Sequence, residues 1–152
     1  MARFAYRMQS ILDLKYKTEG QARMAFSNAL RAVREEEDRL NALYERRARY
    51  VEDGKEMRSR SGGGGGLPVM DILMNDDYIA RMEDLIEVQK AAVKRAEEAL
   101  EIEREKLNQE VQERKMQERL RERAFEEYLA EEKAQEAKEL DERSSFVYGQ
   151  GG

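Results

Sequence analysis

Two kinds of stretch in this sequence contain residue types that could do chemistry. Five consecutive glycines, residues 62–66, have the composition of a phosphate-binding loop, but no Gly-Lys-Ser/Thr follows them and no strand is expected before them. The acidic runs REEEDR (34–39) and EIEREK (101–106) offer carboxylates, but neither has the spacing of a metal-binding loop. We therefore expect no cofactor and no metal site, and we interpret both acidic runs as solvated helix faces.

The residue types that enzymes use most often are missing. The 152-residue sequence contains no Cys and no His. It therefore offers no disulfide, no thiolate nucleophile, no imidazole base and no zinc site built from these residues. We predict that the protein is not an enzyme and has no catalytic residues.

Basic side chains gather before the glycines. The stretch ERRARY (45–50) is followed by Lys55, Arg58 and Arg60. A solvated face is the simplest interpretation, and contact with an acidic protein or an anionic membrane surface is the alternative. Nucleic acid is not an expected partner, because the net charge is −5 and no basic stripe follows the chain.

The elements that must position these residues are two long helices. Charged residues make up 40% of the chain, whereas an ordinary globular domain has about 25%. Such a composition, rich in Ala, Glu, Lys, Leu and Arg, is typical of long helices and coiled coils. The pattern breaks at RSRSGGGGGLPVMD (58–71), because a glycine run destabilises a helix and Pro68 cannot continue one. We expect a first helix at about 4–52, a Gly-rich turn at about 54–70, a second helix at about 71–143 and a disordered tail at 144–152.

Two further expectations concern the second helix and the membrane. The second helix is expected to begin near Asp71 or near Asn75, because the run Asn75, Asp76 and Asp77 supplies cap oxygens and negative charge to a first turn. No stretch approaches the roughly 18 continuous apolar residues of a membrane span. The opening MARFAYRMQS lacks the apolar core of a signal peptide, so we expect a soluble cytoplasmic protein.

An apolar stripe at steps of three and four residues follows each helix. We expect stutters in it, at 25, 29 and 33 and at 103, 107 and 111, where the left-handed supercoil would relax. The first stripe comprises Phe4, Met8, Ile11, Ala22, Ala25, Ala29, Val33, Leu40, Leu43 and Tyr50, with Lys15, Thr18, Glu36 and Arg47 in its gaps. The second comprises Ile79, Met82, Ile86, Val93, Ala96, Leu100, Leu107 and Val111, with Gln89 and Glu103 in its gaps.

Charge favours pairing of the two helices with each other. Residues 1–61 carry 14 basic and 10 acidic side chains, a net charge of +4, and the remainder carries 14 basic and 23 acidic side chains, a net charge of −9. Opposite charges disfavour like-with-like association, and a short connection raises the effective concentration of one arm for the other. We predict an all-α fold, a single antiparallel coiled-coil hairpin over residues 1–152, in a monomer. A parallel homodimer of broken helices is the alternative.

The opening stretch FAYRMQSILDLK (4–15) contains more apolar residues than one seam can use, because they point around the helix. At 1.5 Å per residue the second helix is the longer one, and it passes the start of the first near residues 118–124. About 20 residues, around RAFEEYLAEEKAQEAKELDER (123–143), then extend past the opening patch or pack around it. The patch faces either the second helix or a partner.

These two ends together resemble the FliJ family of flagellar export proteins. FAYRMQSILDLK resembles a family opening of the form FxxRxxxxLxLK, and EEYLAEEKAQEAKELDE (126–142) resembles a closing helix of the form EEYLxEExxxExKxLDE. The chain length and the central break also match. The Gly-rich turn and the tail SSFVYGQGG (144–152) depart from the family pattern.

The resemblance implies a non-catalytic component of bacterial flagellar type III protein export. FliJ proteins are cytoplasmic antiparallel hairpins similar to the stalk subunit of rotary ATPases, and they act in flagellum biogenesis and hence in motility and chemotaxis. The implied partners are the hexameric export ATPase FliI, the export gate protein FlhA and export chaperones, with peripheral association at the inner membrane through these partners. A generic structural coiled coil and a type III secretion chaperone are the alternatives.

The resemblance also suggests two sets of contact residues. We predict that the ATPase is bound at the end with both termini, by Arg7, Gln9, Leu12, Lys15, Tyr128, Glu131, Lys138, Asp141 and Glu142. We predict that the export gate is bound at the turn end, by Leu43, Arg46, Tyr50, Tyr78, Met82 and Leu85. A structural alternative for the first set is that Lys15 and Glu131 only bridge the two helices. A structural alternative for the second is that its residues only complete the seam.

Overall fold

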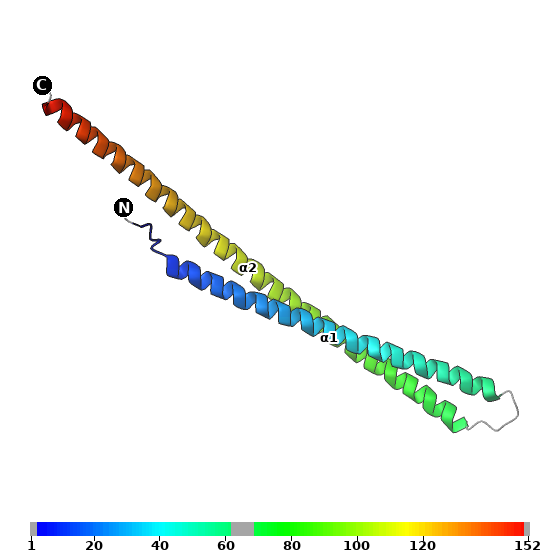
Figure 1. Ribbon diagram of the computed structural model, residues 1–152. Coiled ribbons are helices and arrows are strands. Elements are labelled where there is room, and N and C mark those ends of the chain that lie inside the picture. The colour runs from blue at the N-terminus through cyan, green and yellow to red at the C-terminus, as the bar shows by residue number, and fades with distance from the viewer. Residues whose placement is uncertain (1–2, 62–68, 151–152) are drawn as a thin grey trace. The chain divides into compact units, whose positions relative to one another are not determined.

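Two long helices make up the fold. The computed structural model describes residues 3–61 and 69–150, and over these ranges it contains α1, Gln9–Ser61, and α2, Val69–Gln150, with no strand. The two helices pack against each other and run in opposite directions (Figure 1). The predicted all-α fold, an antiparallel coiled-coil hairpin, is confirmed.

The helix bounds differ from the expected ones. α1 begins at Gln9 rather than near residue 4, and it continues through Gly54 to Ser61 rather than ending near residue 52. α2 begins at Val69, where Asp71 places negative charge in the first turn, so Asn75 caps nothing. The tail expected to be disordered is helical as far as Gln150. The expected turn at 54–70 is therefore helical at both ends, and its centre, 62–68, lies outside the described residues.

The chain divides into two compact units, each containing a part of both helices. The terminal unit comprises Met1–Ala22 and Lys106–Gly152. The central unit comprises Arg23–Glu105. Both units use the same kind of seam between α1 and α2, and each is described below by itself.

The seam follows an uninterrupted seven-residue repeat. Every α1 position on two such repeats is buried or half-buried, namely 12, 19, 26, 33, 40, 47 and 54, and 15, 22, 29, 36, 43, 50 and 57. The matching α2 positions run from Ile72 and from Asn75 at the same interval. Phe26 and Glu110 lie on this repeat, and their neighbours Ala25 and Val111, which the sequence pattern favoured, are half-buried as well. The stutters therefore stay a prediction. A strict repeat of seven is the geometry of a left-handed coiled coil.

The most buried apolar side chains lie on this seam. They are Leu12 in the terminal unit and Val33, Met82 and Ile86 in the central unit, all with 7% or less of their surface exposed. Burying a side chain of this size contributes about 1.5–3 kcal/mol. So few deeply buried residues indicate a shallow core, as expected of two helices that cover only one face of each other.

Candidate functional surfaces

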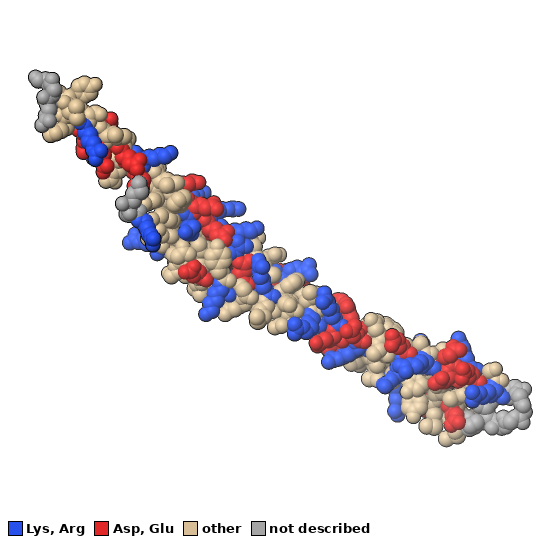
Figure 2. All heavy atoms as spheres, in the orientation of Figure 1, with Lys and Arg blue, Asp and Glu red and all other residues tan. Residues whose placement is uncertain are grey.

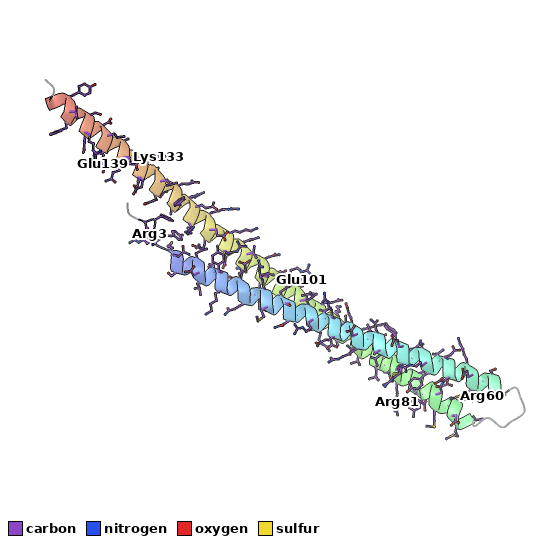
Figure 3. All side chains as sticks on the ribbon, in the orientation of Figure 1. Arg3, Arg60, Arg81, Glu101, Lys133 and Glu139 are labelled. Carbon is purple, nitrogen blue, oxygen red and sulfur yellow. The ribbon has the colours of Figure 1, made fainter. Side chains whose placement is uncertain are left out.

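In the terminal unit, α2 extends past the start of α1. All its side chains from Lys133 to Gly149 are exposed, and Figure 3 labels Lys133 and Glu139 on this stretch, which has no helix beside it. Large apolar side chains here are also in solvent, namely Leu140, Phe146, Val147 and Tyr148. This stretch therefore presents a single charged helix with apolar side chains that the hairpin itself does not use.

The opening patch is divided between α2 and solvent. Phe4 packs on α2, with its ring centre 5.1 Å from that of Phe125 and 5.4 Å from that of Tyr128, and the Arg121 guanidinium lies over the Phe4 ring at 5.8 Å. Tyr6 is half-buried and Leu12 is buried in the seam. Three apolar residues stay exposed, namely Met8, Ile11 and Leu14. Part of the patch therefore faces the second helix, as one of the two predictions had it, and a partner for the exposed part stays a prediction.

Charged and polar groups occupy the terminal seam beside Leu12. Arg114 of α2 donates to the Glu19 carboxylate, which is 5% exposed, and also to Glu118 at 3.1 Å. Lys15 Nζ lies 2.8 Å from Glu113 Oε2. Tyr16 donates its hydroxyl proton to Glu118 at 2.6 Å. Of the two arrangements predicted for Lys15, the structure contains the bridge between the helices.

These contacts shift several pKa values. The hydrogen bonds from Tyr16 and from Arg114 lower the pKa of Glu118, because they stabilise its charged form. The hydrogen bond to Glu113 raises the pKa of Lys15, and the hydrogen bond to Glu118 raises the pKa of Tyr16. Burial raises the pKa of Tyr128, which lies against Phe4.

The structure brings part of the first predicted set together. Arg7, Tyr128 and Glu131 line one open cavity between the opening segment and α2. Gln9 accepts a hydrogen bond from Arg121 at 3.0 Å, whereas Leu12 is 2% exposed and unavailable to a partner while the helices are paired. The remaining members of the set on α2 are exposed, namely Lys138, Asp141 and Glu142.

The second predicted set lies in the central unit. Tyr50 and Tyr78 stack across the seam, with ring centres 5.4 Å apart and planes 18° apart. Tyr78, Leu85 and Arg46 are exposed, Leu43 is half-buried in the seam, and Met82 is 7% exposed. Met82 therefore belongs to the core of the central unit, and the set divides into seam residues and surface residues.

The tyrosine pair borders a groove that the sequence pattern did not indicate. Side chains of both helices line it, namely Tyr50, Asp53, Met57, Asp71, Met74, Asn75 and Tyr78. Next to it the first turns of α2 leave Met70 and Leu73 exposed. A run of apolar residues in VMDILM (69–74) was the available signal, but it lay inside the range assigned to the turn and to the helix start.

Acidic and basic side chains alternate over the visible surface, and no large region has one sign (Figure 2). Arg60 and Arg81, labelled in Figure 3, are among the exposed basic residues of the central unit. In the ranges 3–61 and 69–150 no cluster of acidic side chains could hold a metal ion, and neither helix has a window apolar enough to cross a membrane. Both predicted surfaces therefore combine charged side chains of both signs with exposed apolar ones.

The fold defines a two-helix coiled-coil hairpin, with exposed apolar side chains in both of its units. Comparison with family models identifies it further, since the model of the flagellar FliJ protein matches residues 4–152. The chain belongs to the FliJ family. FliJ proteins are non-catalytic export components, so membership supports a role in flagellar or type III protein export.

A solved structure supports the fold. The Chlamydia trachomatis protein CT670, described as a YscO homologue, superposes with a TM-score of 0.75 and 21% sequence identity, and the match covers 96% of each chain. At this identity the similarity establishes the fold of the hairpin. A comparison with curated proteins found no match.

Proposed function

We propose that this protein is a coiled-coil stalk that binds and stimulates the flagellar export ATPase through its terminal unit, and that contacts the export gate through its central unit. The observation on which this depends is the stretch of α2 from Lys133 to Gly149, exposed on all sides in a member of the FliJ family. A helix that exposes both charge and apolar side chains to solvent is suited to insertion between protein subunits. Such insertion stimulates an enzyme when the active arrangement binds the helix more tightly.

The experiment measures ATP hydrolysis by a FliI-type hexamer as the purified full chain is added. In the variant, Arg7, Lys138 and Glu142 are replaced by Ala; in the matched control, Arg31, Lys94 and Glu98 of the central unit are replaced instead. All six side chains are exposed, so neither variant should change the helical circular dichroism signal. We expect the terminal variant to need about fivefold more protein for half-maximal stimulation, because fewer than about one in three interface residues costs more than about 1 kcal/mol when truncated, and fivefold corresponds to about 1 kcal/mol.

Unchanged stimulation by the terminal variant would exclude these residues as the contact. No stimulation by the wild-type chain would remove the stalk role itself. Tight binding of exported subunits instead of the ATPase would favour the secretion-chaperone hypothesis, and binding of neither would leave a structural coiled coil.

The gate contact is proposed for the exposed members of the second set. Tyr78→Ala together with Leu85→Ala should weaken binding to the cytoplasmic part of FlhA, because both side chains are exposed and Tyr78 lines the groove. Binding to export chaperones, peripheral association with the inner membrane through these partners, and a monomeric stalk in the cytoplasm complete the proposal. A loss of helicity in the double variant would instead assign both residues to the fold.

A further inference from the structure

Two side-chain amides lie in the seam of the central unit, where apolar residues are expected. Asn75 is 4% exposed, and its Nδ2 donates to the backbone oxygen of Tyr50 at 3.0 Å. Gln89 is half-buried, and its Nε2 donates to the backbone oxygen of Glu36 at 3.0 Å and also to the Glu36 carboxylate. Both donors are on α2, and both acceptors are on α1.

The spacing of the two contacts is the same on both helices. Gln89 follows Asn75 by two seven-residue repeats, and Tyr50 follows Glu36 by the same interval. The contacts thus join the two helices at two points of one register. A backbone oxygen is present at every residue of a helix, so the acceptor alone does not select one register. The selection depends on the side chains around each acceptor.

Asn75 has a second requirement, which is a glycine opposite it. A Cβ atom on Gly54 would lie 2.6 Å from Asn75 Nδ2, a separation that only a shift of the amide could relieve. Gly54 is buried inside α1, toward the C-terminal end of the helix, and glycine is otherwise unfavourable within a helix. The other glycine of α1, Gly20, is exposed and has nothing near its Cβ position. The amide of Asn75 therefore fits at Gly54 and has no equivalent site along the α1 seam.

Apolar burial alone does not define this register. Seam positions recur every seven residues, so a slip of one repeat, about 10 Å along the axis, again places seam against seam. In a slipped hairpin the Asn75 amide would face a residue with a side chain instead of Gly54, and the Gln89 amide would lose the Glu36 carboxylate. Buried polar residues at seam positions select one pairing in this way, at some cost in stability.

We propose that Asn75, with its Gly54 notch, and Gln89 are positioning residues that fix the register of α1 against α2 in the central unit. They hold Tyr50 against Tyr78, and thereby determine which α1 side chains border the groove. They select the pairing rather than strengthen it. The proposal does not depend on the identity of the partner that the groove binds.

The test uses the absence of cysteine from the chain, since introduced thiols are then the only ones. In the native register, Arg47 pairs with Glu83 at 2.8 Å; after a slip of one repeat it would be opposite Asp76 or Lys90. Three full-length variants, in which Arg47→Cys is combined with Glu83→Cys, Asp76→Cys or Lys90→Cys, report the register through crosslinking by a short bismaleimide. In the otherwise unchanged chain, only the Glu83 pair should react efficiently.

The test variant replaces both amides, Asn75→Leu with Gln89→Leu, and the control makes the same kind of change at the exposed Asn41. We expect full helicity and an unchanged or higher melting temperature in the test variant, together with at least a fivefold increase in crosslinking of a slipped pair. The control should crosslink only when Arg47→Cys is combined with Glu83→Cys. Crosslinking through Glu83 alone in the test variant, or loss of its helical signal, would overturn the proposal.

A second variant tests the notch. Gly54→Ala should lower the melting temperature because its Cβ displaces the Asn75 amide, and adding Asn75→Ala should restore part of the loss. Equal melting temperatures for the wild type and Gly54→Ala would exclude the notch.

Discussion

The terminal and central units use the same helix pair but different seam chemistry. In the central unit the seam is mostly apolar, with Val33, Met82 and Ile86 buried and two amides interrupting it. In the terminal unit Leu12 is the buried apolar residue, and Glu19 and Arg114 occupy neighbouring seam positions. Apolar burial stabilises a pairing, whereas buried ion pairs contribute little net stability and define which groups can meet. The comparison therefore assigns most of the stability to the central unit, and leaves the terminal unit held by contacts that water, salt and acid can weaken.

The largest effect is expected from the centre of the apolar seam. Ile86→Ala should lower the free energy of unfolding by about 3 kcal/mol, because a buried isoleucine loses its packing and leaves a cavity. Val88→Ala, on the exposed face of the same helix turn, is the control and should change it by less than about 0.5 kcal/mol. Urea titration followed by circular dichroism measures both, and similar losses for the two variants would contradict an apolar core in this unit.

A smaller loss is expected from the terminal seam. Arg114→Ala removes the guanidinium that faces the buried Glu19 carboxylate, and it should lower the melting temperature by less than Ile86→Ala does. Glu19→Leu combined with Arg114→Leu should be at least as stable as Arg114→Ala, since the double variant also removes the buried carboxylate that the Arg114 guanidinium faced. A double variant less stable than the single one would show that the ion pair stabilises the unit beyond the satisfaction of its own charges.

The contrast between the units was only partly visible in the sequence. The repeat of apolar residues and the glycine run were enough to predict two antiparallel helices, because these features are local. The helix ends were not, since Gly54 is buried against Asn75 of the opposite helix, a contact that local propensity does not include. The role of Asn75 was missed for the same reason: next to Asp76 and Asp77 it resembled a helix cap, and only the pairing with Gly54 buries it.

The site predictions show the same limit. Exposed charged residues such as Lys138 and Glu142 could be assigned to the surface from the pattern, and the structure leaves them there. Met82 was on the predicted apolar stripe and the structure buries it, whereas Leu12 could not be separated from its exposed neighbour Ile11, because the choice of the buried one depends on the partner helix. The contacts of both surfaces with partners stay predictions.

A pair of glycine substitutions on α1 compares the two units through changes of about 1 kcal/mol in the free energy of unfolding. Gly20→Ala in the terminal unit should stabilise the hairpin by roughly 0.5–1 kcal/mol, because alanine is the better helix former and nothing lies near the new Cβ. Gly54→Ala in the central unit should destabilise it by about 1 kcal/mol or more, because the Asn75 amide occupies the space. Thermal unfolding measures both signs, and stabilisation by both substitutions would mean that the central seam tolerates a side chain at the notch.

The smallest effect is expected from acid, and it is confined to the terminal unit. The hydrogen bonds from Tyr16 and Arg114 lower the pKa of Glu118 in the folded chain, so its contribution to stability is present above the unfolded pKa and is lost as the pH falls through the folded one. Lys15 and Tyr16 have raised pKa values, so their contributions are present below the unfolded values and are lost as the pH rises through the folded ones.

Because the pKa of Glu118 is lowered, Glu118→Gln should be less stable than the wild type at pH 7. The difference should shrink toward zero below the folded pKa, where the wild-type carboxyl is itself neutral. Melting temperatures of both proteins between pH 7 and pH 2 test this, with Glu97→Gln, an exposed change in the central unit, as the baseline for replacing an acid by an amide. A difference that stays constant as the pH falls would mean that the Glu118 charge does not stabilise the pairing, and that the terminal seam is held by its geometry alone.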